Sequence, residues 1–249
     1  MPEPETYPGQ RPDIKSMFSE ISERYDALNR FMSLGRDRFW RDCLSRRLLV
    51  LGAPGRFLDL ATGTGDQILS IKKFQKGSEV TGLDFSGAML ALAQKKLRVA
   101  SAEGSLGDPM PTLVRGDALT PPLPAGSFDS VTISFGLRNI AEKKALYASI
   151  LRLLRPGGRF LALEVFFDPR SLLAPIHLWH LKTVIPFMAG QIFQSSGEAY
   201  AYLCDSVVDF PHPHRVIDDL LAAGFVNPGF RAYTFGGAAI IWCHKPPDA

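Results

Sequence analysis

Residues 59–66 (DLATGTGD) combine two carboxylates, two threonines and two glycines in a pattern that suits nucleoside binding. Gly63 and Gly65 lack a Cβ atom, so the backbone can turn sharply and approach a ligand closely. Asp84 ends the next predicted strand, where an acidic side chain in a Rossmann-like sheet accepts hydrogen bonds from ribose hydroxyls. Each feature alone has a structural explanation, as a strand-to-helix turn or as a carboxylate near a helix N-terminus. Together they predict a nucleoside site made by Asp59, Thr62, Gly63, Thr64, Gly65, Asp66 and Asp84.

The charge of this loop favours S-adenosyl-L-methionine over a dinucleotide. A dinucleotide fingerprint requires a third glycine, where this chain has Ile68, and a helix N-terminus open to pyrophosphate. Asp66 begins the predicted helix and would repel a pyrophosphate. S-adenosyl-L-methionine carries a sulfonium and an amine and no phosphate, so the carboxylates of Asp59 and Asp66 fit it. We therefore expect S-adenosyl-L-methionine as the cofactor.

Polar residues also follow the third and fourth predicted strands, at the sheet edge where open α/β proteins bind ligands. Asp117, beside Ala118, could accept a hydrogen bond from an adenine amino group or could only stabilise its own turn. Ser134 ends the fourth strand, and Arg138 and Asn139 follow it with donors able to stabilise an oxyanion. A surface ion pair for Arg138 and a helix cap for Asn139 explain these two residues equally well. The pattern leaves both readings open.

Short apolar runs that alternate with amphipathic segments predict the elements that position these residues. Strands are expected at 57–60, 80–83, 113–114, 128–135 and 160–165, with helices at 66–74, 86–100 and 142–154. This alternation indicates a parallel sheet with helices on both faces. Residues 229–234 and 238–244 are two further strands, joined by a connection so short that they must form an antiparallel hairpin. The predicted fold is α/β, a seven-stranded Rossmann-like class I methyltransferase sheet that ends in an antiparallel hairpin.

The chain reads as one domain, 1–249, in four parts. Residues 1–55 form an N-terminal helical cap, with a helix at 14–28 and a second one for which Asp37 is the expected N-cap. Residues 56–165 form the cofactor-binding core, 166–212 the helices that cover the substrate, and 213–249 a closing helix and the hairpin. The apolar stretch 172–193 is interrupted by charges and prolines, so we expect broken helices on the protein and no membrane span.

Five segments resemble the menaquinone/ubiquinone biosynthesis C-methyltransferase family, and the match extends over about residues 14–245. They are the helix around Arg24-Tyr25-Asp26, the loop 58–66, the loop Phe135-Gly136-Leu137-Arg138-Asn139, the turn 154–159 and the segment 164–166. The resemblance implies S-adenosylmethionine-dependent C-methylation of a lipophilic prenylated quinol, demethylmenaquinol, without a metal. The alternatives are a benzoquinol of the ubiquinone pathway, another small apolar molecule, or a non-catalytic S-adenosylmethionine-binding scaffold.

The resemblance also implies that Tyr25, Arg138 and Asn139 border the quinol. A quinol carbon becomes nucleophilic when the neighbouring hydroxyl ionises, and methyl transfer then depends mainly on in-line positioning. A guanidinium stays protonated in proteins, so we expect Arg138 to stabilise the phenolate and a water to accept the proton. Ala61 replaces the first glycine of the broad methyltransferase motif, which costs nothing if the backbone there is extended.

Composition excludes several other classes. The chain has 28 Lys and Arg against 25 Asp and Glu, a net charge of +3, which is too small for an obligate nucleic-acid binder. Three separated cysteines form no disulfide framework, so a reducing cytoplasm is expected, and the histidines complete no metal site. Residues 30–56 are rich in arginine. A solvated helix face explains these charges, and the functional alternative is attraction to the inner face of an anionic membrane. A homodimer is left open.

Overall fold

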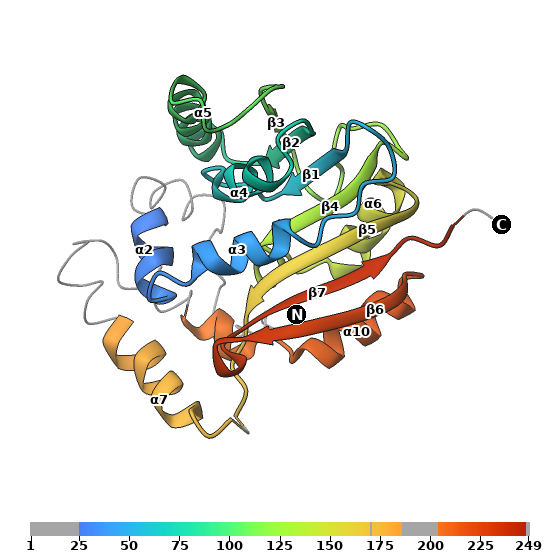
Figure 1. Ribbon diagram of the computed structural model, residues 1–249. Helices are drawn as coiled ribbons and strands as arrows, with labels where there is room; N and C mark the ends of the chain where they lie inside the picture. The colour runs from blue at the N-terminus through green and yellow to red at the C-terminus, as the bar shows by residue number, and fades with distance from the viewer. Residues whose placement is uncertain (1–24, 170, 186–203, 248–249) are drawn as a thin grey trace, which may run out of the picture.

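The computed structural model describes residues 25–169, 171–185 and 204–247, so the first predicted helix is seen only from Tyr25 onward. A seven-stranded sheet forms the centre of the described part (Figure 1). Its parallel strands lie in the order β3 (Thr112–Arg115), β2 (Glu79–Asp84), β1 (Arg56–Leu60), β4 (Phe128–Ser134) and β5 (Leu154–Val165). Next to β5 lies β7 (Ala238–His244), antiparallel to it and to the edge strand β6 (Val226–Tyr233). The predicted fold class and its C-terminal hairpin are confirmed.

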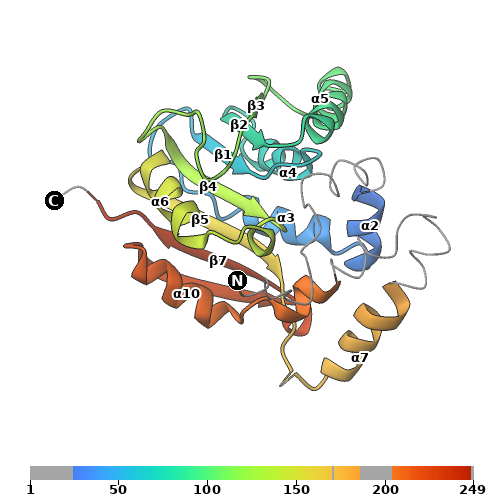
Figure 2. The same cartoon turned by 180° about the vertical axis from the view of Figure 1, so that it is seen from behind.

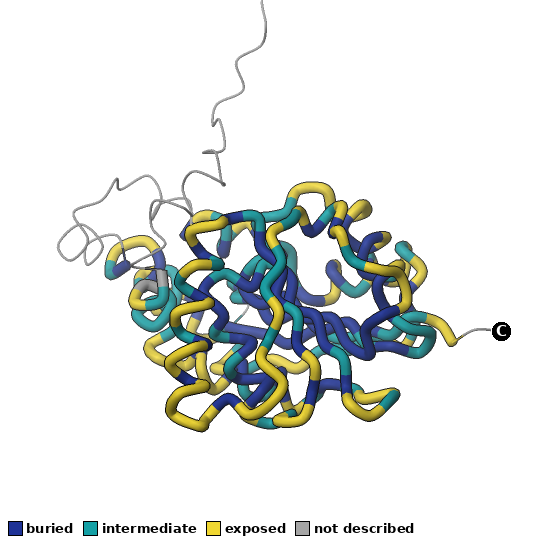
Figure 3. The backbone as a smooth tube through the Cα atoms, turned by 90° about the horizontal axis from the view of Figure 1, so that it is seen from above, coloured by how far each residue is buried: buried dark blue, intermediate teal, exposed yellow. Residues whose placement is uncertain are grey.

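Helices cover both faces of the sheet (Figure 2). One face carries α3 (Asp37–Ser45), α4 (Asp66–Phe74) and α5 (Gly87–Ala102), and the other carries α6 (Lys143–Leu153) and α10 (Pro213–Ala222). Side chains alternate across a strand, so β5 supplies Phe160 and Ala162 to one core and Leu161 and Leu163 to the other. Because both faces are covered, the central strands are almost wholly buried, as Figure 3 shows.

Two local predictions are wrong in ways that have physical reasons. Asp37 is the first residue of α3 and follows the cap residue Arg36; its buried carboxylate accepts a hydrogen bond from Ser33 Oγ at 3.1 Å. The strand expected at 160–165 is longer than predicted, because β5 begins at Leu154, directly after α6, and includes Pro156, Gly157 and Gly158. The strand absorbs these residues through a register shift against β4, which the positive φ of Gly157 (72°) permits.

Two helices lie beyond the sheet, on the side where β5 ends (Figures 1 and 2). They are α2 (Tyr25–Met32) and α7 (Ala174–Trp179), and a π-helical turn, His180–Val184, continues α7. Pro175 lies in the first turn of α7, where a missing N–H costs nothing, so it begins the helix and does not break it. Pro186 lies outside the described residues. No helix in the described ranges has the length and apolar character needed to cross a membrane.

Candidate active site

The turn after β1 leaves the extended backbone at three positions. Ala61, Gly63 and Gly65 have φ angles of 51°, 56° and 83°. The two glycines adopt this region without steric cost, but Ala61 does not meet the condition of an extended backbone under which it would replace glycine at no cost. Left-handed backbone costs an alanine roughly 1–2 kcal/mol, so surrounding contacts must hold it in place. One neighbour is Gly136, where an added Cβ would lie only 2.9 Å from the Ala61 Cβ.

Asp84, at the end of β2, crosses to this turn and fixes it. Its two carboxylate oxygens accept hydrogen bonds from the backbone N–H groups of Gly63 and Ser86, each at 2.8 Å. Burial raises the pKa of Asp84, and these backbone donors counteract the shift without reversing it. Each carboxylate oxygen has two lone pairs, so the group can accept ribose hydroxyls in addition. The predicted role of Asp84 therefore fits its geometry.

A cavity of about 100 Å³ lies between the loops that follow β1, β2, β3 and β4. Of the predicted cofactor-binding residues, five line it: Gly63, Asp84, Asp117, Ala118 and Ser134. Asp117 is placed for both of its predicted roles. It lines the cavity, where it can accept from an adenine amino group, and its Oδ1 accepts from Leu119 N at 2.9 Å, which stabilises its own turn. Sequence reasoning missed the apolar walls, Leu83, Phe85, Met89 and Ile140. This combination of apolar walls and one buried carboxylate suits an adenosyl group; we call it the nucleoside cavity.

Asp59 and Thr62 do not line the nucleoside cavity. Asp59, 1% exposed, accepts hydrogen bonds from the hydroxyls of Thr62 (2.6 Å) and Thr132 (2.7 Å). Burial raises its pKa to about 6, although these two hydroxyls lower it. Asp59 therefore braces β1 against β4 and the glycine turn, and its role toward the amine of the cofactor stays a prediction.

Thr64 and Asp66 face the N-terminal helix α2. The Asp66 carboxylate pairs with Lys96 Nζ (2.6 Å) and Arg30 Nη2 (3.3 Å), and Thr64 Oγ1 donates to Asp26 Oδ1 at 2.5 Å. Lys96 also pairs with Asp26, so the lysine bridges α2 and the glycine turn. Burial by itself raises the pKa of Asp66, but the charges of Arg41, Lys96 and Arg30 hold it below its usual value. The negative charge expected to repel pyrophosphate is thus compensated within the protein.

Arg138 lies in the short 3-10 helix Leu137–Asn139 after β4, and its partner is Glu164 at the end of β5. The two side chains are 3% and 0% exposed, so the expected surface ion pair is instead a buried one, and the oxyanion-stabilising role of Arg138 stays a prediction. Glu164 also accepts from the Arg138 backbone N–H at 3.1 Å, and Arg138 Nε donates to Ser206 Oγ at 3.2 Å. The guanidinium is therefore held in one orientation.

Phe135 connects the nucleoside cavity to a second cavity, since it lines both of them. Its φ of 59° is unusual for a large side chain and places the ring between Trp40 and the Arg41 guanidinium, which lies 4.9 Å from the ring centroid. The carbonyl oxygen of Phe135 accepts from Arg138 Nη1 at 3.0 Å and from Asn139 Nδ2 at 3.4 Å. The strained residue thus orients the two side chains that follow it.

The second cavity is larger, about 290 Å³, and mostly apolar; we call it the apolar cavity. Its walls come from α2, α7, the ends of β4 and β5 and the connection between β6 and β7. Arg138 lines it, whereas Asn139 lines the nucleoside cavity, and the contact of both residues with a quinol stays a prediction. Tyr25 is the first residue of α2, and its side chain lies outside the described part of the structure.

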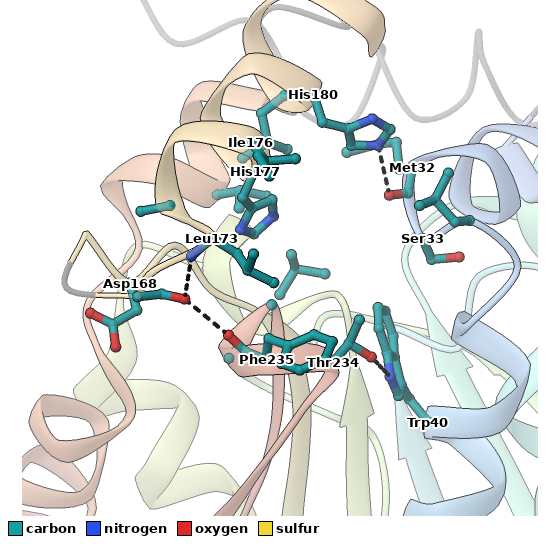
Figure 4. A pocket seen from close by; sticks show the side chains of 18 of the residues that line it. Met32, Ser33, Trp40, Asp168, Leu173, Ile176, His177, His180, Thr234 and Phe235 are labelled. Atoms are coloured by element: carbon teal, nitrogen blue, oxygen red, sulfur yellow. Dashed lines mark hydrogen bonds between the residues drawn. The ribbon is translucent and has the colours of Figure 1, made fainter.

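Two histidines, His177 and His180, line the apolar cavity (Figure 4). His180 Nε2 lies 3.4 Å from the Met32 carbonyl oxygen and so connects α7 to α2. Burial, followed by the neighbouring charge of His180, lowers the pKa of His177. The described residues contain no group of three His, Cys, Asp or Glu side chains that could hold a metal ion.

Comparisons with known proteins agree with this arrangement. The model of the ubiE/COQ5 methyltransferase family matches residues 6–245. A demethylmenaquinone methyltransferase from Thermus thermophilus is 42% identical over 233 residues, which cover 92% of this chain and 100% of that protein. The chain belongs to the ubiE/COQ5 methyltransferase family. A second relative, the ubiquinone/menaquinone biosynthesis C-methyltransferase UbiE of Syntrophotalea carbinolica, is 40% identical and covers 96% of this chain and 97% of its own length.

Solved structures extend the likeness of the fold beyond the ubiE/COQ5 family. The [4+2]-cyclase SpnF has a TM-score of 0.65 at 16% identity and covers 94% of this chain and 96% of its own. A SAM-dependent methyltransferase from Thermotoga maritima, described as a possible histamine N-methyltransferase, has a TM-score of 0.61 at 17% identity over 93% of this chain and 99% of that one. At such identities the likeness shows the fold alone, and the chemistry must be argued from the site.

Sequence reasoning identified the loops of this family site but missed several contacts that complete it. Glu164 carried a usable signal, because an acidic residue ended an otherwise apolar strand predicted to be buried. Lys96 and Asp26 gave no local signal, because their partners at the glycine turn are far away in the sequence. The sequence indicated Phe135 only as part of the loop 135–139. Its position between the two cavities could not be predicted, because it depends on the backbone conformation of this residue.

Proposed function

We propose that this chain transfers a methyl group from S-adenosyl-L-methionine to a ring carbon of a prenylated quinol, with demethylmenaquinol as the substrate. One observation carries the proposal: a nucleoside cavity and an apolar cavity meet at one residue, Phe135, with the buried guanidinium of Arg138 in the wall of the second. Membership of the ubiE/COQ5 family and the names of the relatives support it.

The residues of the nucleoside cavity fit the proposed cofactor. Asp84 keeps lone pairs for ribose hydroxyls, Asp117 can accept from an adenine amino group, and Met89 and Ile140 supply apolar contact for the base. When bound, S-adenosyl-L-methionine supplies an electrophilic methyl group on a positively charged sulfur. Membership of a methyltransferase family supports this assignment independently.

The apolar cavity provides what the quinol needs. Loss of the hydroxyl proton to water leaves a phenolate whose negative charge spreads to the neighbouring ring carbon. That carbon would take the methyl group while the bond between the methyl group and sulfur breaks, with its electron pair staying on sulfur and S-adenosylhomocysteine as the other product. The guanidinium of Arg138 stays protonated and is buried, so it holds the phenolate oxygen without acting as a base. Aromatic and aliphatic walls exclude water and leave room for the prenyl chain. The ring carbon then loses its own proton to restore aromaticity.

The test is methyl transfer from labelled S-adenosyl-L-methionine to paired naphthoquinol and benzoquinol acceptors. We expect methylation at carbon and faster turnover of the demethylated naphthoquinol. Faster turnover of the benzoquinol would transfer the assignment to the ubiquinone pathway, which the name of the second relative includes. Binding of S-adenosyl-L-methionine without methylation of either acceptor would overturn the proposal in favour of a non-catalytic scaffold.

An Asp84→Ala variant tests the cofactor site separately. The change removes the acceptor for ribose and for the Gly63 and Ser86 backbone donors, so S-adenosyl-L-methionine should bind at least tenfold more weakly. Unchanged affinity in isothermal titration calorimetry would contradict the proposed place of the cofactor. Glu79→Ala, at the exposed start of the same strand, is the matched control.

A further inference from the structure

Large apolar side chains that face solvent gather around the mouth of the apolar cavity. Five of them line the cavity and are also exposed, by 81% for Phe235 and 74% for Leu34, and one more, Leu172, is 97% exposed beside them in the chain. We call this set the apolar rim: Leu34, Leu172, Leu173, Ile176, Trp179 and Phe235. It comes from three separate places in the fold, the α2–α3 turn, the α7 region and the β6–β7 connection. A contiguous exposed apolar patch of this kind marks an interaction site.

The backbone places two of these side chains in solvent at a cost. Leu34 and Phe235 have φ angles of 51° and 54°, in the left-handed region that non-glycine residues rarely adopt. Neither side chain gains burial within the chain that could offset this strain. The backbone at Leu34 closes the C-terminal turn of α2, with Gly35 N donating to Arg30 O at 2.7 Å, so folding explains the conformation but not the large apolar side chain that it presents to solvent.

Charge identifies the occupant of the apolar rim. Two exposed cations, Arg36 and Arg38, lie between the exposed apolar residues Leu34 and Phe39 at the α2–α3 turn, and Lys182 is exposed just beyond α7. Of these three cations Lys182 disfavours a protein partner, because the core of a protein interface is depleted of lysine, although not of arginine. Cations beside tryptophan and aliphatic side chains are instead typical of a segment lying at the headgroup boundary of an anionic bilayer.

We propose that the apolar rim docks on an anionic lipid bilayer, so that the apolar cavity opens toward the acyl chains. This rests on the proposed function, because a prenylated quinol is dissolved in that region. The quinol ring would enter the cavity past Phe235 and Trp179 while its prenyl tail stays among the lipids. Docking would spare the tail from crossing water, which costs about 0.8 kcal/mol per exposed CH₂ group.

Flotation with vesicles tests docking without any catalytic step. The full chain should bind vesicles with anionic headgroups, bind neutral vesicles more weakly, and lose binding as salt increases. Leu172→Gln lies outside the cavity wall and should weaken binding at least tenfold while leaving turnover of a short-chain, water-soluble quinol unchanged. Leu221→Gln is the matched control, because this exposed leucine lies on α10, on the opposite face of the sheet from α3.

Tryptophan fluorescence supplies a second readout. Trp40 is buried and Trp242 half-buried, whereas Trp179 is 60% exposed, so docking should shift the emission to the blue and Trp179→Phe should abolish the shift. No vesicle binding, or equal effects of the variants at 172 and 221, would overturn the proposal. A dimer in sedimentation velocity that Leu172→Gln dissociates, without vesicle binding, would assign the apolar rim to a second copy of the chain instead. Vesicle binding by a protein that methylates no quinol would refute the proposed function and leave docking intact.

Discussion

Removing the charge of Arg138 should affect stability and turnover by different routes, which a paired substitution can separate. Arg138→Ala leaves Glu164, 0% exposed, buried without its cation, and breaking such a pair typically costs 3–5 kcal/mol. Total stabilities of domains are about 5–15 kcal/mol, so the variant should fold but unfold at a much lower urea concentration. The double variant Arg138→Gln/Glu164→Gln removes both charges and lets two amides hydrogen-bond. It should recover to within about 1.5 kcal/mol of the natural protein.

Turnover should not recover with stability. If the guanidinium holds the phenolate, the double variant lacks that charge and should lose at least a hundredfold in turnover, about 2.7 kcal/mol of the barrier. Its affinity for S-adenosyl-L-methionine should change less than threefold, because Arg138 does not line the nucleoside cavity. Urea unfolding, calorimetry and labelled methyl transfer measure the three quantities on the same samples. A double variant with normal turnover, or an Arg138→Ala protein as stable as the natural one, would refute this reasoning.

Three further predictions concern the packing around the site. Lys72 is fully buried, and its ammonium donates to the carbonyl oxygens of Lys76, Ser78, Asp108 and Pro109. In urea unfolding, Lys72→Met should therefore lower the free energy of unfolding by about 2–4 kcal/mol. The control Lys144→Met, at an exposed position, should lower it by about 0.5 kcal/mol. Burial raises the pKa of Asp59 from 3.8 to about 6, so the folded state keeps a proton that the unfolded chain has lost between these pH values. The Asp59 contribution to the free energy of unfolding should therefore fall by about 2.4 kcal/mol as pH rises from 4 to 7. Comparison of urea unfolding for Asp59→Asn and the natural protein should show this fall, and parallel pH curves would contradict it. Gly136→Ala places a Cβ 2.9 Å from that of Ala61 and should cost 1–3 kcal/mol, and adding Ala61→Gly should restore the melting temperature; no rescue would mean that the two loops do not press on each other.

The order of strands and helices could be predicted because each depends on local periodicity. The runs at 57–60 and 238–244 lie between covering helices or against a paired strand, so their apolar patterns were clear. The helix expected at 86–100 is present as α5, and its N-cap is Ser86, whose hydroxyl accepts from Met89 N at 3.4 Å. The prediction of Asp37 as the cap was wrong because its carboxylate accepts a hydrogen bond from Ser33. That contact depends on how the preceding turn folds.

The site could be predicted only where a residue acts on its own loop. Asp84 was identified because its position at the end of a strand determines its role. Asp59 and Asp66 were identified as acidic but not as paired, because their partners Thr132 and Lys96 come from other elements. The sequence likewise could not show that Arg138 and Glu164 neutralise each other, since β4 and β5 must first lie side by side. Tertiary contacts decide which of two plausible roles a polar side chain takes.

The place of β7 has a consequence for the newly made protein. This strand lies between β5 and β6, although it is the last of the seven described strands in the chain, and the residues before it, 234–237, complete the wall of the apolar cavity. During synthesis, one edge of β5 therefore stays unpaired until residues 238–244 have left the ribosome. An unpaired edge invites wrong partners, so a chaperone would be most useful in that interval. A ribosome stalled before residue 234 would display a nascent chain with the glycine turn already made but no wall to enclose a quinol.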